Sequence, residues 1–418
     1  MRPTRLRYGK QEFPVRFDDS RFAVLDAPGE SIPLTDVELG KRFDSPIASP
    51  PIEDLISPGE SVLLVVPDAT RNSAAGQIVN LLVRRLIANG TMPHEMAAIF
   101  ATGIHRRVTE EEKKEIVTPF IAQRIKLSDH DASNPIKVFN VGTTSGGIPV
   151  ELNWMLTEYD HVVLVGSVAF HYFAGFSGGR KLICPGLASA KTIAATHALA
   201  FDPELPGRRA GVAPGVLEGN PVHEAFVQSA SKVNITYAFN SIVGENGEAV
   251  GLYCGDWLES HASACSAYAA ANTVTIDEKR ELVVVSCGGS PYDINMIQAH
   301  KALNAASAAC SDGGTIVLFA ECPDGLGRDD FLDWFSSANS GELARRLCEN
   351  YKVNGQTAWN LLQITERFRV RMVTSLAEDA ARTMRIERID ADSAFHQIET
   401  HAGPGFLIPH GARINIFA

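Results

Sequence analysis

The feature that most restricts the fold of this chain is a repeated alternation of nearly continuous Val/Ile/Leu runs with amphipathic helical patterns. The apolar runs lie at residues 61–66, 96–100, 161–166, 281–286 and 314–320. Each of the first four leads through a loop with polar residues, and most of these loops lead into a helical pattern. Strands without polar alternation are typical of parallel sheets covered by helices on both faces. The pattern therefore predicts an α/β fold with mainly parallel sheets flanked by helices.

Length and charge limit the classes of protein that the chain can form. Its 418 residues correspond to two or three domains, and a polar segment, 268–280, is the candidate boundary. Lys and Arg number 38 against 49 Asp and Glu, which argues against nonspecific nucleic-acid binding. The longest apolar run, 162–170, is about half of the ~20 residues that a membrane-spanning helix needs, so we expect no membrane partner.

The cysteines and the amino terminus favour a cytoplasmic protein. The seven cysteines include no C-x-x-C motif, so we expect neither a disulfide framework nor a Cys-rich zinc site. The basic residues after Met1 lead into Gly9-Lys10-Gln11 and not into an apolar stretch, so we expect no secretory signal.

The chemistry is expected in the segments that follow the strands, because ligands of open parallel sheets bind beyond the carboxyl ends of the strands. The candidate side chains there are Asp68, Arg71, His105, His171, Lys181, Gln298 and Lys301. A histidine directly after a strand can act as a general base near neutral pH, although it can equally be a solvated loop residue. An Asp and an Arg three residues apart can also form a helix cap and a local ion pair. A Gln and a Lys one helical turn apart can hold a carboxylate together or form a solvated face.

The densest loop spans residues 171–197. Within it, Ser177-Gly178-Gly179 precedes two basic residues, a composition that suits a phosphate-binding loop because glycines let backbone N–H groups approach the anion. Arg180 or Lys181 could neutralise the charge. The segment is not a P-loop, since the last glycine and the following Ser or Thr of that motif are missing. A tight turn is the alternative reading of the glycines.

Taken together and in this order, these residues resemble the nickel-pincer-dependent lactate racemase family. The likeness runs from the Asp68 loop to the Lys301 helix. It is carried mainly by 171–197, where a lysine follows the first histidine by ten residues and a second histidine follows it by twenty-six. The resemblance implies a cofactor derived from nicotinic-acid mononucleotide, with square-planar nickel held by a sulfur–carbon–sulfur pincer and one histidine. It also implies cofactor-maturation enzymes as partners.

The resemblance implies a role for each candidate residue. The nickel ligand corresponds to His197, and the lysine that carries the nickel-pincer nucleotide covalently corresponds to Lys181. The paired acid/base residues correspond to His105 and His171. The other cofactor contacts correspond to Asp68, Ser177, Gly178 and Gly179. The substrate-binding residues correspond to Arg71, Gln298 and Lys301.

The implied activity is racemisation or epimerisation of a 2-hydroxy acid by proton-coupled hydride transfer. The hydrogen on C2 is too weakly acidic for a histidine to remove at neutral pH, so hydride transfer avoids a carbanion. Ile297 stands where, by our placement, the lactate enzyme has a tyrosine, so the substrate beyond C2 stays open. The resemblance also implies two α/β domains, 1–277 and 278–402, with 403–418 returning to the first and the active site in the cleft between them.

Two other functions fit the same loops. A pyridoxal-phosphate racemase would use Lys181 for the imine and the Ser177-Gly178-Gly179 loop for the phosphate. A non-catalytic nucleotide- or phosphate-binding protein would need only the loop. In every case the ligand is a small molecule, and the chain is compatible with a homo-oligomer. Nickel in the purified protein would separate the first function from these two.

Overall fold

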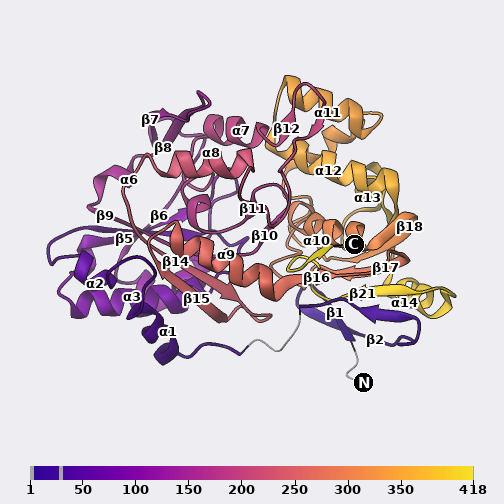
Figure 1. Ribbon diagram of the computed structural model, residues 1–418, viewed down its shortest axis with the longest axis horizontal. Coiled ribbons are helices and arrows are strands. Elements are labelled where there is room, and N and C mark those ends of the chain that lie inside the picture. The colour runs from indigo at the N-terminus through magenta and orange to yellow at the C-terminus, as the bar shows by residue number, and fades with distance from the viewer. Residues whose placement is uncertain (1–3, 28–31, 418) are drawn as a thin grey trace. The chain divides into compact units, whose positions relative to one another are not determined.

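The computed structural model describes residues 4–27 and 32–417 (Figure 1). These residues divide into two compact units. Unit 1 falls within Met1–Gly29, Ala200–Ala210 and Ala269–Ala418, and unit 2 falls within Glu30–Leu199 and Gly211–Tyr268. Each unit contains a mainly parallel sheet with helices, which confirms the α/β class predicted from the sequence.

Unit 2 is built on a six-stranded sheet in the order β15-β14-β9-β4-β5-β6, in which only β14 and β15 pair antiparallel. Its strands are β4 (Val62–Pro67), β5 (Met96–Ala101), β6 (Lys126–Asp129), β9 (His161–Ser167), β14 (Ile235–Val243) and β15 (Ala249–Gly255). Two antiparallel hairpins also belong to this unit: β7 (Val138–Thr143) with β8 (Pro149–Asn153), and β10 (Phe170–His171) with β11 (Gly175–Phe176).

The helices of unit 2 are α1 (Asp36–Phe43), α2 (Ile52–Leu55), α3 (Ala75–Ala88), η1 (Pro93–Glu95), α4 (Glu110–Val117), α5 (Pro119–Ala122), α6 (Met155–Glu158), η2 (Gly179–Leu182), α7 (Ala190–Ala198), α8 (Pro221–Ala230) and the first part of α9 (Glu259–Asn272). Its core forms where the central strand meets α3. All of β4 is buried, and Leu64 shares one apolar cluster with Ile78 and Leu82. A capping box formed by Thr109 and Glu112 begins α4.

Unit 1 contains a second six-stranded sheet, in the order β20-β19-β18-β17-β21-β3, and all of its neighbouring strands are parallel. Its strands are β3 (Phe22–Val24), β17 (Arg280–Ser286), β18 (Cys310–Phe319), β19 (Arg369–Val373), β20 (Glu387–Ile389) and β21 (Gly405–Ile408). Smaller pairs are β1 (Thr4–Tyr8) with β2 (Gln11–Val15), β12 (Phe201–Asp202) with β13 (Gly207–Arg208), and β16 (Thr273–Thr275) with β22 (Asn415–Phe417). The helices are α10 (Met296–Ala309), η3 (Asp329–Ser336), α11 (Ser340–Glu349), α12 (Val353–Arg367), α13 (Glu378–Thr383) and α14 (Ala391–Thr400).

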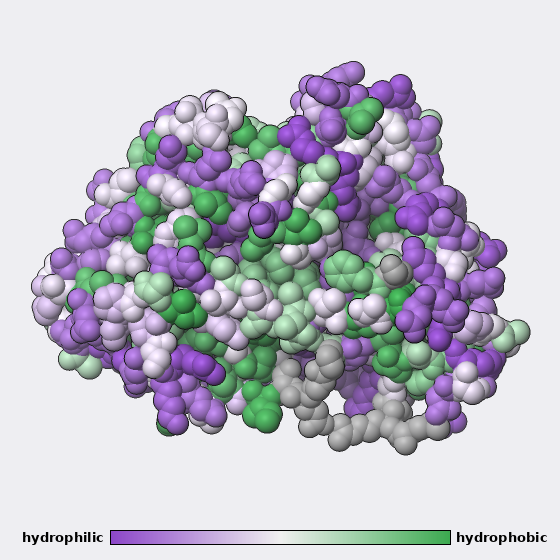
Figure 2. All heavy atoms as spheres, viewed as in Figure 1, coloured by the Kyte–Doolittle hydropathy of each residue, from purple (hydrophilic) through white to green (hydrophobic). Residues whose placement is uncertain are grey.

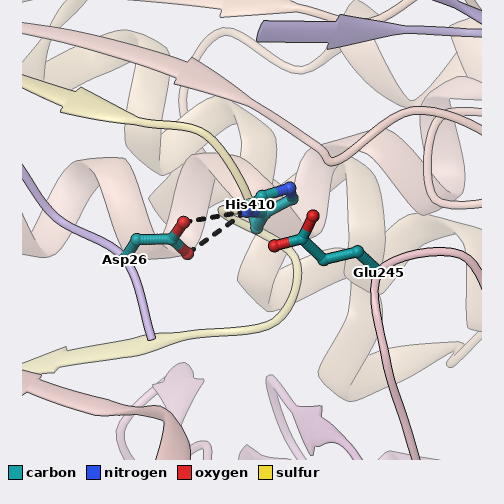
Figure 3. Close-up of side chains that lie close together, drawn as sticks. All are labelled: Asp26, Glu245 and His410. Atoms are coloured by element: carbon teal, nitrogen blue, oxygen red, sulfur yellow. Dashed lines mark hydrogen bonds and ion pairs between the residues drawn. The ribbon is translucent and has the colours of Figure 1, made fainter. Parts of the chain in front are cut away.

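We expected residues 1–277 and 403–418 to form one domain. In the structure the amino-terminal residues instead group with the carboxyl-terminal part of the chain, in unit 1. The carboxyl-terminal strand β21 pairs with β17 and with β3, so both ends of the chain belong to the sheet of unit 1. Leu6 and Phe22 share an apolar cluster with Val284 and Val317, which explains why the amino-terminal strands stay with this unit. His410 Nδ1 also lies 3.0 Å from Asp26 Oδ2 and ties the two ends together (Figure 3).

None of the described helices is both long and apolar enough to cross a bilayer. Hydrophilic and hydrophobic residues are interspersed on the face shown in Figure 2.

Candidate active site

The loops after β4 and β5 meet through Asp68 and His105. Because β4 and β5 are parallel neighbours, both loops leave the sheet at the same edge. The buried carboxylate of Asp68 accepts hydrogen bonds from Thr70 Oγ1 at 2.6 Å and Thr70 N at 3.0 Å. Its second oxygen lies 2.6 Å from His105 Nδ1. The side chain of His105 is 35% exposed and that of Asp68 only 5%. The histidine is therefore held from the buried side, and part of its ring remains accessible.

The charge of Asp68 determines which nitrogen of His105 carries the proton. Burial by itself would raise the pKa of Asp68, but the charges of His105 and Arg71 and the hydrogen bonds to the carboxylate outweigh it and lower that pKa to about 2. An ionised carboxylate only accepts hydrogen bonds, so Nδ1 of His105 donates. In the neutral ring, Nε2 is then the basic nitrogen.

His171 lies on the β10–β11 hairpin and has the opposite arrangement. Its ring is buried, stacks on Tyr172 at 5.3 Å and meets the ring of Phe173 edge-on at 4.5 Å between centroids. The N–H of Ala174 donates to His171 Nδ1 at 3.4 Å. A nitrogen that accepts carries no proton, so the neutral ring of His171 has its proton on Nε2. One histidine thus offers a base at Nε2 and the other an N–H.

Phe173 brings His171, Lys181 and His197 together. The ring of Phe173 lies 4.5 Å from that of His171 and 5.1 Å from that of His197, and Lys181 Nζ lies 5.5 Å from its centroid. Phe226 of α8 lies near two of these residues. The centroid of its ring is 5.2 Å from that of His197 and 5.7 Å from Lys181 Nζ. Two histidines and the lysine of the 171–197 segment therefore surround one aromatic side chain.

His197 is a neutral imidazole with an unused nitrogen. Burial, and then the charge of Lys181, lower the pKa of His197 to about 3. Its Nδ1 is buried and has no hydrogen-bond partner among the described residues. Buried polar atoms are nearly always paired, so such a nitrogen is a candidate to bind a group from outside the chain. A neutral imidazole nitrogen is the form that binds nickel and other transition metals.

The Ser177-Gly178-Gly179 loop is tightly packed. The hydroxyl of Ser177 donates to Ser167 O at 2.9 Å and accepts from Ala169 N at 2.8 Å. Gly178 has φ +73°, and a Cβ there would lie 2.8 Å from Ser167 O. Gly179 has φ +48°, and a Cβ there would lie 2.6 Å from the ring of His261. The backbone conformation and the close neighbours both favour glycine, which supports the tight-turn reading of these positions.

Arg180 is not available as the anion-binding cation that the sequence offered. It is 1% exposed, and its guanidinium donates to Ala174 O at 2.8 Å and to His261 Nε2 at 2.9 Å. The buried carbonyl oxygens of Ala174, Ser177 and Gly178 need hydrogen-bond donors, and the guanidinium of Arg180 supplies them. Of the basic pair, only Lys181 is partly exposed.

Gln298 and Lys301 lie on α10 in unit 1. They share one face of the helix as predicted, and Lys301 Nζ donates to Gln298 Oε1 at 2.5 Å. The helix begins at Asn295, whose side chain accepts from the N–H of Gln298. The pair offers an amide and a positive charge side by side.

Sequence reasoning missed the aromatic side chains around the histidines. Phe173 lies two residues after His171, so the motif contained a signal for it. Phe226 comes from a different helix, and no spacing rule points to it. Asn220, which caps α8 and donates to Phe173 O at 3.0 Å, joins the two aromatic positions. The one local sequence signal for this cap is the proline that follows it, because proline is common at the first position of a helix.

Two family models match the chain. The lactate racemase N-terminal domain matches residues 8–206, and the lactate racemase C-terminal domain matches residues 276–405. Curated proteins named lactate racemase from Thermoanaerobacterium thermosaccharolyticum and Lactiplantibacillus plantarum are each 30% identical, over 335 and 331 residues. The alignments cover 79% and 78% of this chain and 77% and 76% of those proteins.

Solved structures agree with these matches. The lactate racemase apoprotein from Thermoanaerobacterium thermosaccharolyticum matches over 100% of both chains, with a TM-score of 0.85 and 26% identity. A protein from Thermotoga maritima matches over 93% of this chain and 100% of its own, with a TM-score of 0.73 and 20% identity, which shows a shared fold. The fold and the relatives define an α/β isomerase of the racemase type. More specifically, the chain belongs to the lactate racemase family. The resemblance identified in the sequence is thus confirmed.

Proposed function

We propose that this protein racemises or epimerises a 2-hydroxy acid with the help of a nickel-pincer nucleotide. The observation that carries the proposal is the gathering of His171, Lys181 and His197 around Phe173, with a buried nitrogen of His197 left without a partner. The curated relatives are named lactate racemases, so lactate is the first substrate to test.

The residues present fit the cofactor that the family implies. His197 supplies a neutral nitrogen for nickel, and Lys181, beside it, supplies the amine for covalent attachment. The family resemblance assigns the remaining contacts to the pyridinium ring and phosphate to Asp68 and the Ser177-Gly178-Gly179 loop. The tight packing of the two glycines and the paired hydroxyl of Ser177 do not themselves support a phosphate contact. When bound, this group supplies a reversible hydride acceptor, so the protein does not have to stabilise a carbanion.

The protein's own part in the reaction is to move protons and hold the substrate. Nε2 of His105 takes the hydroxyl proton of one enantiomer, and Nε2 of His171 holds the proton on the other side. The roles reverse for the opposite direction. A racemase that works both ways needs two such groups.

The substrate carboxylate is assigned to Arg71, Gln298 and Lys301. Burial lowers the pKa of Arg71, and the charge of Asp68 partly offsets this. A guanidinium nevertheless keeps its proton in proteins, so Arg71 remains a cation. Fixing the carboxylate keeps C2 in place while its geometry inverts.

The test is racemisation of enantiopure 2-hydroxy acids, starting with lactate, by protein co-expressed with the cofactor-maturation enzymes. Chiral chromatography should show both enantiomers after incubation of either one. His105→Ala and His171→Ala should each lower turnover by ~10² or more, as expected for the loss of a general acid or base. His94→Ala, a surface histidine outside the site, is the control. Wild-type turnover in both variants would overturn the assignment.

A further inference from the structure

Arg180 is a buried cation without a carboxylate partner within the described residues. Its Nη1 lies 2.9 Å from His261 Nε2 and within 3.3 and 3.4 Å of Ser177 O and Gly178 O, and its Nη2 lies 2.8 Å from Ala174 O. Burying a cation costs free energy unless hydrogen bonds offset it. This side chain therefore has a use beyond filling space.

Two contacts of His261 bear on which ring nitrogen carries the proton, because Nε2 lies 2.9 Å from Arg180 Nη1 and also 2.9 Å from Ser177 O. One nitrogen cannot both accept from the guanidinium and donate to the carbonyl. Ser177 O already accepts from Arg180 Nη1 at 3.3 Å, so the acceptor role is assigned to Nε2 and the proton of the neutral ring to Nδ1. Burial, followed by the charge of Arg180, holds the pKa of His261 well below its ordinary value, so the ring stays neutral. Cys265 Sγ, one turn further along α9, lies 3.7 Å from Nδ1 and 3.5 Å from Nε2 of His261. The His261 ring also occupies the space beside Gly179.

The other end of Arg180 reaches His171 through one residue. Ala174 O accepts from Arg180 Nη2 at 2.8 Å, while Ala174 N donates to His171 Nδ1 at 3.4 Å. Because the two hydrogen bonds use the peptide groups on either side of the Ala174 Cα, moving Ala174 would change the hydrogen bond to Nδ1 of His171. Arg180 also precedes Lys181 in the short helix η2.

We propose that Arg180 and His261 form a positioning pair: His261 holds the guanidinium, and Arg180 holds Ala174 so that the proton of His171 stays on Nε2. The catalytic consequence of this pair rests on the proposed function, whereas the hydrogen-bonded chain itself does not. Neither Arg180 nor His261 is assigned a contact with the substrate or the cofactor. The pair acts through Ala174 on His171.

The first test is a long-range ¹H–¹⁵N correlation spectrum of ¹⁵N-histidine-labelled protein made without maturation enzymes. We expect His261 with its proton on Nδ1 and His171 with its proton on Nε2, the signals being assigned from His261→Gln and His171→Gln. Arg180→Met should shift the His171 ring-nitrogen signals, toward a mixture of tautomers. Arg85→Lys, which weakens a partly buried arginine contact on α3, should leave them in place. Unchanged His171 signals in folded Arg180→Met would overturn the proposal, as would a proton on Nε2 of His261.

The second test uses matured enzyme and a variant that restores the acceptor. His261→Leu removes the acceptor for Arg180, whereas the Oε1 of His261→Gln can replace it. Loss of one hydrogen bond to a charged group should lower kcat about tenfold in His261→Leu, with KM within about twofold, and His261→Gln should recover most of the loss. Equal kcat values in the two variants would contradict the pair. If the spectra agree with the tautomers but wild type racemises no 2-hydroxy acid, the proposed function fails and the positioning pair stands.

Discussion

At the residue scale, the most informative pair is Asp68 and His105. The carboxylate is buried and ionised, because the charges and hydrogen bonds around it lower its pKa to about 2. It keeps the proton of the neutral His105 ring on Nδ1, so that Nε2 is the nitrogen that would act as the base in the proposed reaction. Neither residue alone would have this property.

Asp68→Asn should separate this effect from binding. An amide can donate as well as accept, so His105 can adopt the wrong tautomer in this variant. We expect kcat to fall by ~10² with a small change in KM. Asp131→Asn, at a carboxylate paired with exposed Arg107, is the matched control. Steady-state racemisation kinetics would measure both, and equal kcat values would show that Asp68 has no such role.

Lys181 gives a prediction that does not depend on activity. If this amine carries the cofactor, intact-protein mass spectrometry of the matured enzyme should show an adduct that is absent from Lys181→Ala. Lys191→Ala, which removes a lysine from the neighbouring helix α7, should keep the adduct. An adduct that persists in Lys181→Ala would place the attachment elsewhere.

At the element scale, the loop that leads into η2 depends on two glycines with positive φ. Gly179→Ala would both strain the backbone and push a Cβ into the ring of His261. Gly219→Ala has a similar φ, +70°, but no heavy atom within 4 Å of the new Cβ. The second variant therefore measures backbone strain alone, of order 1 kcal/mol. Urea unfolding should show a further loss of ~1–3 kcal/mol for Gly179→Ala. Equal losses of unfolding free energy in the two variants would mean that the His261 ring can move aside at no cost.

Elements with a strong local pattern could be predicted from the sequence. The apolar runs at 61–66 and 96–100 correspond to β4 and β5. The pairing of β3 with β21 was not predicted, since strands almost 400 residues apart carry no local signal of their pairing.

The same distinction applies to the site. His171, Lys181 and His197 could be proposed as site residues because they belong to one segment with a recognisable spacing, and the three side chains do lie around Phe173. The burial of Arg180 was not foreseen, because its place depends on carbonyl oxygens and on His261, which comes from another helix. The sequence suggested Arg180 as a cation that could bind a phosphate, whereas in the structure its guanidinium is buried and hydrogen-bonded within the protein.

At the scale of the whole molecule, buried neutral histidines make stability depend on pH. Burial is the largest cause that lowers the pKa of His130 to about 4 and that of His300 to about 3. In the unfolded chain both would titrate near 6.5, so the unfolded state binds more protons between that value and the folded pKa. Stability should therefore fall as pH decreases below 6.5, by about 2 kcal/mol for each histidine at pH 5.

His130→Gln tests the sign of this effect. The amide can still donate to Ala188 O and accept from Asn153, the two partners of the His130 ring, but it does not titrate. Urea unfolding at pH 7 and pH 5 should show a smaller loss for the variant than for wild type. The same loss in both would assign the acid sensitivity to other groups.

The two sheets also end on strands that discourage aggregation. At one edge of unit 2, β6 is only four residues long, and Lys113 pairs with its Asp129 at 2.7 Å. At one edge of unit 1, β20 has three residues, and its Glu387 pairs with Arg371 at 2.8 Å. Short edge strands such as β6 and β20 offer few backbone groups to a strand from another molecule, and pairing with them would bury charged side chains. The protein can thus carry long apolar strands in its interior without exposing a template for fibril growth at these two borders.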